Sequence, residues 1–403
     1  MARLSSKSAN PTSRNIPNCH NRFITMIKIE ITPRVFHFKQ PATTSRGAYT
    51  ERKSWMVTIT DTQTKRQGVG ECAPLPDLSC DAIAEYHSIL SAACQHIEQT
   101  GTINRQMLLP YPSMLFGLET AMAHLQAGSY ALFNTPFSRG EAPIVINGLV
   151  WMGSFDEMMV RIEEKLSQGF HCVKLKIGAI DFDSELEMIK SIRKRFSYHD
   201  LELRVDANGG FCFDEALYKL ELLSQYSIHS IEQPIRQRQW ANMAELCRES
   251  PLPIALDEEL IGINIPDMKR QVLNIIKPAY IVLKPSLHGG MSGTREWVAI
   301  ARSMGIGSWI TSALESNVGL NAVAQLAADI YMSGNDRRTH GIMPQGLGTG
   351  QLYTDNIPMP LQLKGEQLWF NTDMTDNTDN TDNTDMNDKN DMTDMNDNTD
   401  MTS

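Results

Sequence analysis

The chain has 403 residues, of which 41% are hydrophobic, so it can bury a core large enough for one large domain or two. The formal net charge is −10, but residues 371–403 carry ten aspartates, at every third position from Asp373 to Asp400, against one lysine. That tail holds −9, so about −1 is left for the rest, which has no basic stripe of the kind that binds nucleic acid. No run of about 18 apolar residues is present, so we expect no membrane helix.

The two ends of the chain differ from the middle in composition. Residues 1–25 are basic and contain no acidic residue, a composition typical of an organelle transit peptide or of a disordered extension, and we favour the extension. Residues 371–403 repeat Asp, Asn and Thr and have no apolar face, so we expect a disordered tail. Its acidic oxygens could hold cations loosely, but it lacks the glycine and glutamate of an EF-hand loop.

The seven cysteines are scattered and form no CxxC pair. This spacing argues against a disulfide framework and against a zinc site. It indicates a protein of a reducing compartment, and we expect the cytoplasm.

Residues 26–142 read as an α+β unit. Strands are predicted at 26–38 and 54–61, loops at 40–50 and 68–79, and helices at 81–99 and 113–133. Strands followed by helices favour an α+β domain.

Residues 143–350 alternate short apolar strands with amphipathic helices. The eight predicted strands are 143–151, 172–178, 201–209, 228–234, 253–259, 280–286, 307–313 and 340–346. This rhythm predicts an α/β fold, a (β/α)8-type barrel. An open doubly wound sheet is the alternative, and the absence of a dinucleotide fingerprint favours the barrel.

Unusual polar residues recur at the ends of these strands. They are Lys174 and Lys176, Asp206, Glu232, Asp257, Lys284 and Ser312. From Lys176 onward they are spaced by one β/α unit each, so they should meet at the carboxyl end of the barrel. Lys174 and Lys176 lie two positions apart on one strand and therefore point the same way. We expect the two lysines to face the three carboxylates there.

The residue types predict a reaction class. Three carboxylates without His or Cys form an oxygen-only site suited to Mg²⁺, with Mn²⁺ as a possible substitute. A lysine beside a second cation and a metal should have a lowered pKa and become a usable base. Lys284 would stand on the opposite side of a ligand from Lys176. This arrangement favours proton abstraction next to a carboxylate, although each strand-end residue alone could be a cap or a structural ion-pair partner.

Other positions carry a weaker signal. Asn208 could hydrogen-bond near Asp206 or serve the turn before Gly209, and Glu258 could support the neighbouring ligand. Ser312 could donate to a substrate carboxylate or cap a helix. The stretch 340–351, which includes Gly346, could offer backbone N–H groups to a substrate anion, or it could be an ordinary glycine-rich loop.

The motifs "KLKIG", "RVDANGGF", "IEQP", "ALDEE" and "VLKPS" resemble those of the enolase superfamily, in its muconate-lactonizing subgroup. The segments "TSRG", "GECAPLPDLS", "YPSMLFGLETA", "INGLVWMG" and "ITSALESNVG" extend the resemblance to its o-succinylbenzoate synthase family. The resemblance covers roughly residues 26–370 and leaves out both terminal extensions.

The resemblance implies a function in menaquinone biosynthesis, on a small-molecule carboxylate. Mg²⁺ would be held by Asp206, Glu232 and Asp257. Lys176 would take the α-proton of 2-succinyl-6-hydroxy-2,4-cyclohexadiene-1-carboxylate and return it to the departing hydroxyl on the same face, with Lys174 tuning Lys176 and Lys284 stabilising the enolate. The α+β unit at 26–142, completed by about 351–370, would cap the barrel mouth, and its 42–47 and 70–79 loops would shape the pocket and exclude water. The implied substrate contacts are Ser45, Arg46, Ser312 and Gly346.

Two alternatives stay open. Opposed lysines also suit N-acylamino acid racemases and dipeptide epimerases, although the latter usually carry an Asp-x-Asp pair on the eighth strand, where this chain reads "HGIMPQG". A catalytically silent enolase-fold protein would be expected to have lost a lysine or a ligand, and none is missing. We expect no nucleic-acid or membrane partner and leave the oligomeric state open.

Overall fold

The computed structural model describes residues 26–44, 47–150, 155–178, 181–333 and 342–374. The predicted extension at 1–25, most of the predicted tail, and the predicted substrate contacts Ser45 and Arg46 lie outside these ranges. Among the helices that are described, none is both long enough and apolar enough to cross a bilayer.

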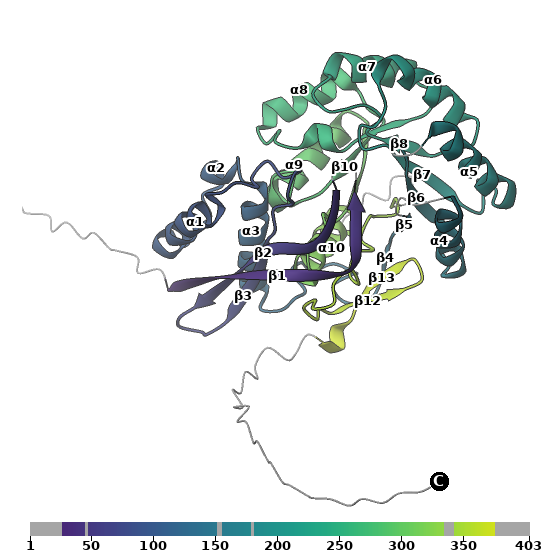
Figure 1. The fold of residues 1–403 in the computed structure, drawn as a ribbon. Coiled ribbons are helices and arrows are strands. Elements are labelled where there is room, and N and C mark those ends of the chain that lie inside the picture. The colour runs from purple at the N-terminus through teal and green to yellow at the C-terminus, as the bar shows by residue number, and fades with distance from the viewer. Residues whose placement is uncertain (1–25, 45–46, 151–154, 179–180, 334–341, 375–403) are drawn as a thin grey trace, which may run out of the picture.

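The N-terminal part combines a three-stranded antiparallel sheet with three helices, beside the barrel (Figure 1). The strands are β1 (Ile27–Thr44), β2 (Gly47–Asp61) and β3 (Gln67–Cys72), in that order, and the helices are α1 (Tyr86–Thr100), α2 (Arg105–Leu108) and α3 (Pro112–Ala127). Apolar residues alternate along β1 and β2, as in Ile29, Ile31, Val57 and Ile59, and pack against α1 and α3 in one core. The structure therefore has the predicted α+β character in this part of the chain.

Strands extend into both predicted loops of the N-terminal part. The stretch 40–50 continues β1 to Thr44 and starts β2 at Gly47, with a register shift between His37 and Ala42. Composition misled the prediction because β1 is an edge strand with an irregularity, the setting in which a sheet tolerates Pro41. In the stretch 68–79, residues 68–72 belong to β3.

A close helix–sheet approach explains the glycines of β3. A Cβ atom added at Gly70 would lie 1.9 Å from the carbonyl oxygen of Gly117 in α3. Gly70 and Gly117 are therefore needed for close packing between β3 and α3 and not for a turn.

The prediction of a helix to residue 133 was also wrong, because Gly128 adopts the left-handed conformation with φ of 68° and ends α3 at Ala127.

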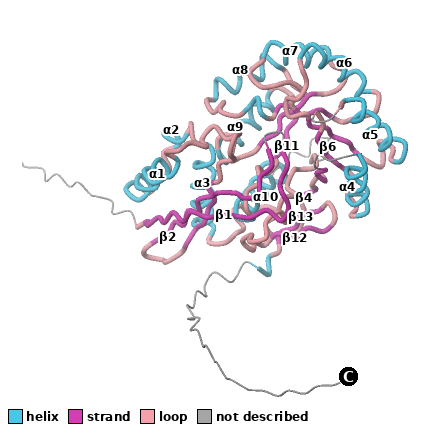
Figure 2. The backbone as a smooth tube through the Cα atoms, in the orientation of Figure 1, coloured by secondary structure: helices cyan, strands magenta, loops and turns pink. Residues whose placement is uncertain are grey.

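Seven parallel strands form the wall of the barrel, in the spatial order β11-β10-β9-β8-β7-β6-β5. Their bounds are β5 (Gly148–Val150), β6 (Cys172–Lys176), β7 (Glu202–Asp206), β8 (Ser230–Glu232), β9 (Ile254–Leu256), β10 (Tyr280–Leu283) and β11 (Gly307–Ile310). The helices between and after them are α4 (Phe155–Ser167), α5 (Phe182–Arg195), α6 (Phe213–Ser224), α7 (Trp240–Glu249), α8 (Pro266–Ile276), α9 (Gly290–Ser303) and α10 (Asn317–Met332), with a 3-10 turn η1 (Glu258–Leu260). Figure 2 shows these helices around the strands.

Two residues close the barrel at the eighth position. Gly346 forms a parallel bridge with Thr311, next to β11, and Gln345 forms one with Ile146, next to β5. The predicted strand at 340–346 is thus reduced to these bridges among the residues described. The closure confirms the predicted barrel over the open sheet.

The predicted first strand at 143–151 is divided. Its first part, β4 (Ile144–Val145), pairs with the hairpin of β12 (Leu361–Lys364) and β13 (Gln367–Phe370), and only its second part, β5, joins the barrel. The described chain ends in a 3-10 turn, η2 (Thr372–Met374), so the start of the predicted tail is ordered in the structure.

A buried carboxylate joins the N-terminal sheet to the barrel. Glu71 of β3 is fully buried and accepts hydrogen bonds from the backbone and hydroxyl of Ser316 and from the amide of Gly319, at the start of α10. It also accepts from the hydroxyl of Ser54 in β2. A carboxylate at a helix N-terminus is favoured by the orphan N–H groups and the helix dipole.

Candidate active site

The parallel register brings the predicted strand-end residues together. Lys176 is paired in register with Asp206, and Asp206 with Glu232, at the carboxyl ends of β6, β7 and β8. Asp257 and Lys284 follow directly after β9 and β10. Because β6 to β10 are neighbours in the sheet, these residues form one ring segment at the barrel mouth.

The lysines of β6 contact the carboxylates directly. The Nζ atom of Lys174 lies 3.0 Å from Oδ2 of Asp206 and 2.9 Å from Oε2 of Glu232. The Nζ atom of Lys176 lies 2.5 Å from the same Asp206 oxygen. Across the ring, Lys284 forms an ion pair with Asp257. The two inward-facing lysines of β6 are thus balanced by the buried carboxylates of Asp206 and Glu232.

Opposite charges decide the protonation of this cluster. Burial alone would lower the pKa of Lys174, but the carboxylates of Asp206 and Glu232 outweigh it and hold that pKa above its usual value. Burial would likewise raise the pKa of Asp206, and the adjacent lysines hold it below its ordinary range. The pKa of Lys284 is raised, since Asp257 and Glu232 outweigh its burial. Lys174 and Lys284 are therefore cations, and Asp206 is an anion, at neutral pH.

The carboxylates of Glu232 and Asp257 are less stable in their charged form than that of Asp206. Burial and the neighbouring Asp206 raise the pKa of Glu232 to about 8, and burial raises the pKa of Asp257 despite its pairing with Lys284. One oxygen of each, Oε1 of Glu232 and Oδ1 of Asp257, is buried without a hydrogen-bond partner. Buried like charges and orphan carboxylate oxygens are what a divalent cation would relieve, so the donor set fits Mg²⁺.

The same carboxylates serve as lysine partners in the structure. Within the described ranges, no three His, Cys, Asp or Glu side chains are placed so that they could hold a metal ion as they stand. The ammonium of Lys174 lies between Asp206 and Glu232, at hydrogen-bond distance from both. The metal site therefore stays a prediction, supported by the chemistry of the donors.

Asn208 and Glu258 extend the cluster. The Nζ atom of Lys176 donates to Oδ1 of Asn208 at 2.8 Å, and Nδ2 of Asn208 donates to Oε1 of Glu258 at 2.9 Å. The backbone amide of Asn208 also donates to Asp206. Both residues thus lie where the sequence suggested, and Asn208 holds the ammonium of Lys176 as well as the Asp206 carboxylate.

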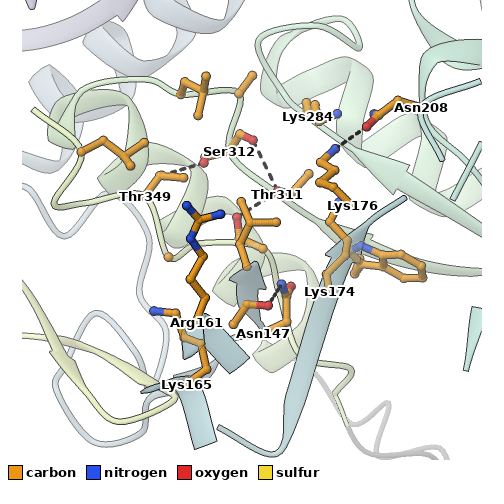
Figure 3. Close-up of a pocket in the computed structure, with 18 of the residues that line it drawn as sticks. Asn147, Arg161, Lys165, Lys174, Lys176, Asn208, Lys284, Thr311, Ser312 and Thr349 are labelled. Atoms are coloured by element: carbon orange, nitrogen blue, oxygen red, sulfur yellow. Dashed lines mark hydrogen bonds between the residues drawn. The ribbon is translucent and has the colours of Figure 1, made fainter. Parts of the chain in front are cut away.

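A cavity of about 400 Å³ opens above the cluster (Figure 3). The strand-end residues that line it are Lys174, Lys176, Asn208, Glu258, Lys284, Ser312 and Gly346. The N-terminal part contributes Gln40, Tyr49, Leu75 and Leu78, from the two stretches that were expected to shape the pocket or from beside them. The cavity is therefore enclosed jointly by the barrel and by the N-terminal part.

The predicted substrate contacts differ in their surroundings. Ser312 is buried, and its hydroxyl lies 2.7 Å from that of Thr349, on the cavity wall. Gly346 lines the cavity, but its N–H donates to the carbonyl of Ile310 at 2.9 Å, so it is used in closing the barrel. The role of Gly346 as a substrate contact stays a prediction, supported by its place in the cavity wall and not by its N–H group.

Sequence reasoning missed several lining residues. Thr311 and Thr349 stand beside Ser312, and Arg161 and Lys165 reach the cavity from α4. The two basic residues belong to a helix with the ordinary amphipathic pattern, in which they are indistinguishable from a solvated polar face. No sequence signal marked them as part of the site.

Two family matches cover most of the described chain. Residues 157–368 match the family described as enolase C-terminal domain-like, and residues 38–125 match the N-terminal domain of MenC. The first match includes all seven strand-end positions, and the second lies within the α+β part.

Individual proteins of this superfamily are similar to the chain in sequence and in structure. The chain is 43% identical over 365 residues to the o-succinylbenzoate synthase of Desulfotalea psychrophila (strain LSv54), which covers 81% of this chain and 95% of that protein. The crystal structure of MenC from the same strain superposes with a TM-score of 0.73 at 38% identity, covering 85% of this chain and 99% of that one. The L-Ala-D/L-Glu epimerase of Bacillus subtilis is 30% identical over 181 residues, 44% of this chain and 48% of that protein.

Proposed function

Since the chain belongs to the enolase superfamily, we propose that it is an o-succinylbenzoate synthase, a hydro-lyase of menaquinone biosynthesis. The reaction removes water from 2-succinyl-6-hydroxy-2,4-cyclohexadiene-1-carboxylate and leaves o-succinylbenzoate. The observation that carries the proposal is that Lys176 and Lys284 enter one cavity from two sides of a buried carboxylate cluster. The substrate is suggested by the relative from Desulfotalea psychrophila and its name.

Asp206, Glu232 and Asp257 would hold Mg²⁺, for which Mn²⁺ can substitute. Their support is the oxygen-only donor set and the unpartnered oxygens of Glu232 and Asp257. When bound, the ion supplies positive charge next to the ring carboxylate of the substrate, where negative charge grows as the α-proton leaves.

Lys176 is the proposed base. In its neutral form, Nζ takes the proton from the ring carbon that bears the carboxylate, and the C–H electron pair moves towards that carboxylate. The same Nζ then returns the proton to the hydroxyl on the same face as the C–O bond breaks. Water leaves and the ring becomes aromatic, so one proton and one hydroxide depart and no co-reactant is needed. Asn208 accepts from Nζ and fixes its position for both transfers.

The other two lysines keep their protons. Lys174 donates to Asp206 and Glu232 and places a fixed positive charge beside Lys176, which shares the same Asp206 oxygen. Lys284, paired with Asp257, places a positive charge on the opposite side of the cavity, where it stabilises the enolate. Leu75 and Leu78 line the cavity with apolar surface, which helps to exclude water from the reacting face.

The second candidate is racemisation or epimerisation of an acylated amino acid or a dipeptide. It is favoured by the two lysines on opposite sides of the cavity, which suit removal and return of a proton on two faces, and by the similarity to an L-Ala-D/L-Glu epimerase. Against it stands the eighth-strand stretch "HGIMPQG", which lacks an Asp-x-Asp pair.

A comparison of three substrates tests the proposal. The purified full chain is supplied with Mg²⁺ and, in separate reactions, with the cyclohexadiene substrate, an N-succinyl amino acid and L-Ala-L-Glu in deuterated water. We expect loss of the diene absorbance at a kcat/KM at least about 100-fold above that for α-deuteration of either alternative, a gap of roughly 2.7 kcal/mol. Faster deuteration would favour the racemase or epimerase, and inactivity with all three would favour a binding protein.

We also propose that the protein works in the reducing cytoplasm. The cysteines within the described ranges, Cys72, Cys80, Cys94, Cys172, Cys212 and Cys247, are all unpaired. Free thiols in this number are usual where glutathione and thioredoxin keep them reduced.

A further inference from the structure

The cavity extends beyond the lysine–carboxylate cluster. In addition to the strand-end residues, it is lined by Arg161 and Lys165 of α4, with Glu164 beside them, and by Asn147 of the segment before β5. Figure 3 shows the guanidinium of Arg161 directed into the cavity towards Thr311 and Ser312, and Lys284 on the other side of this view. One cavity therefore has a carboxylate-and-lysine end and a second end to which α4 brings basic side chains.

The two basic residues of α4 are placed differently. The ammonium of Lys165 lies 5.1 Å from the centre of the Phe170 ring and 3.3 Å from the side-chain oxygen of Gln168, and its stem packs against Gly148. Its charge is therefore directed to groups of the cavity edge. The planar guanidinium of Arg161 is the group suited to bind a carboxylate with two parallel hydrogen bonds.

The proposed substrate has a matching charge. It carries two carboxylates, one on the ring and one at the end of the succinyl chain. The ring carboxylate must lie at the carboxylate-and-lysine end, because the carbon that loses its proton has to reach Lys176. The succinyl chain then extends from the ring towards the rest of the cavity, and a buried carboxylate without a cation would be costly.

We propose that Arg161 binds the terminal carboxylate of the succinyl chain and so selects acyl chains that end in an acid. This inference rests on the proposed function and adds a specificity-determining residue to it. The hydroxyls of Ser312 and Thr349, which lie 2.7 Å apart on the same cavity wall, are close enough to each other to donate to the same anion. Arg161 touches the substrate far from the reacting carbons, so it governs binding and leaves the proton transfers to Lys176.

The test compares two ligands that differ only in the terminal carboxylate. They are o-succinylbenzoate and 2-butanoylbenzoate, titrated calorimetrically into the full chain with Mg²⁺. The wild type should bind the diacid about 10- to 100-fold more tightly, as expected for hydrogen bonds to a charged group. Arg161→Met should lose this preference, Arg161→Lys should restore part of it, and the KM of Arg161→Met should rise by a similar factor at a kcat within about threefold.

Arg195→Met is the matched control, because Arg195 of α5 is exposed, pairs with Glu163 and does not line the cavity. It should keep the full preference. Either of two results overturns the inference: the wild type binds both ligands equally, or Arg161→Met keeps the preference for the diacid. The first result needs no variant, so it can be read even if Arg161→Met fails to fold. If one of these two results is found and the wild type still dehydrates the substrate, the Arg161 inference fails and the proposed function stands. If wild type neither binds the diacid nor dehydrates the substrate, the proposed function fails with it.

Discussion

Lys176 and Glu258 are joined through a single side-chain amide. Asn208 accepts a hydrogen bond from Nζ of Lys176 at 2.8 Å through its oxygen and donates to Glu258 at 2.9 Å through its nitrogen. Asn208 has a φ of 45°, a left-handed conformation that Asn and Asp adopt more readily than other side chains. The amide is thus fixed at both ends, and it fixes the proposed base in turn.

Replacing this amide by a carboxylate tests the role of Lys176 as the base. Asn208→Asp is nearly isosteric and places a negative charge beside Nζ of Lys176. An ion pair with this carboxylate engages Nζ and opposes its action as a base, so kcat/KM near pH 7 should fall by about tenfold. Asn242→Asp on α7, whose side chain bonds Gln239, is the control and should keep the wild-type kcat/KM. An unchanged kcat/KM in Asn208→Asp would contradict the assignment.

Mg²⁺ should stabilise the folded chain through Glu232. A ligand at about 100 times its dissociation constant adds roughly 2.7 kcal/mol to the free energy of unfolding. Mg²⁺ should therefore raise the melting temperature of the wild type, and a chelator should reverse the rise. Glu232→Gln should lose this response because it removes one of the three anionic ligands, whereas Glu245→Gln, on the exposed face of α7, should retain it. A full Mg²⁺ response in Glu232→Gln would show that the ion binds elsewhere.

The pKa of Glu232 also predicts how the chelated protein responds to pH. Because the folded-state pKa is raised to about 8, the buried carboxylate disfavours folding once it is charged. Its contribution to stability is complete below the unfolded pKa of about 4.3 and is lost as the pH rises through 8. In chelator, the urea concentration at the unfolding midpoint should decrease as the pH is raised from 5.5 to 8.5, and it should decrease more for the wild type than for Glu232→Gln. Parallel pH profiles of the two proteins would contradict the raised pKa.

Glu71 should be important for stability although it lies away from the chemistry. Glu71→Gln keeps the shape but weakens four hydrogen bonds that a buried carboxylate accepts from Ser54, Ser316 and Gly319. We expect a loss of about 2 kcal/mol in the free energy of unfolding, measured in urea. Glu51→Gln, on β2 of the same sheet, is the control. Glu51 is exposed, and its carboxylate lies 3.9 Å from the ammonium of Lys53. Equal midpoints for the two variants would show that Glu71 adds nothing beyond packing.

The sequence predicted the positions of the strand-end residues well. Lys176, Asp206 and Glu232 recur at the interval of one β/α unit, and parallel strands bring their carboxyl ends to one edge. What could not be read was how these charges pair. That Lys174 bridges Asp206 and Glu232 depends on side-chain reach across three strands, which spacing alone does not contain.

Other features were hidden because tertiary contacts override local composition. Residues 40–44 and 47–50 have the composition of a loop but are strand, since Gly47 to Tyr49 pair with Ala42 to Thr44 at the end of β1. Arg161 follows the polar pattern of α4, and only the folded barrel turns it towards the cavity. Glu71 stands in a glycine- and proline-rich stretch, and its burial depends on the start of α10, more than 240 residues away.

The most direct test of the chemistry compares the wild type with Lys176→Ala on 2-succinyl-6-hydroxy-2,4-cyclohexadiene-1-carboxylate with Mg²⁺, followed by the loss of diene absorbance. We predict that the wild type forms o-succinylbenzoate, that chelator stops it, and that Lys176→Ala lowers kcat by about 10²- to 10⁴-fold while its circular dichroism stays that of the wild type. A wild type that leaves the diene unchanged, or a Lys176→Ala variant that converts it at the wild-type rate, would contradict Lys176-dependent dehydration as the function of this chain.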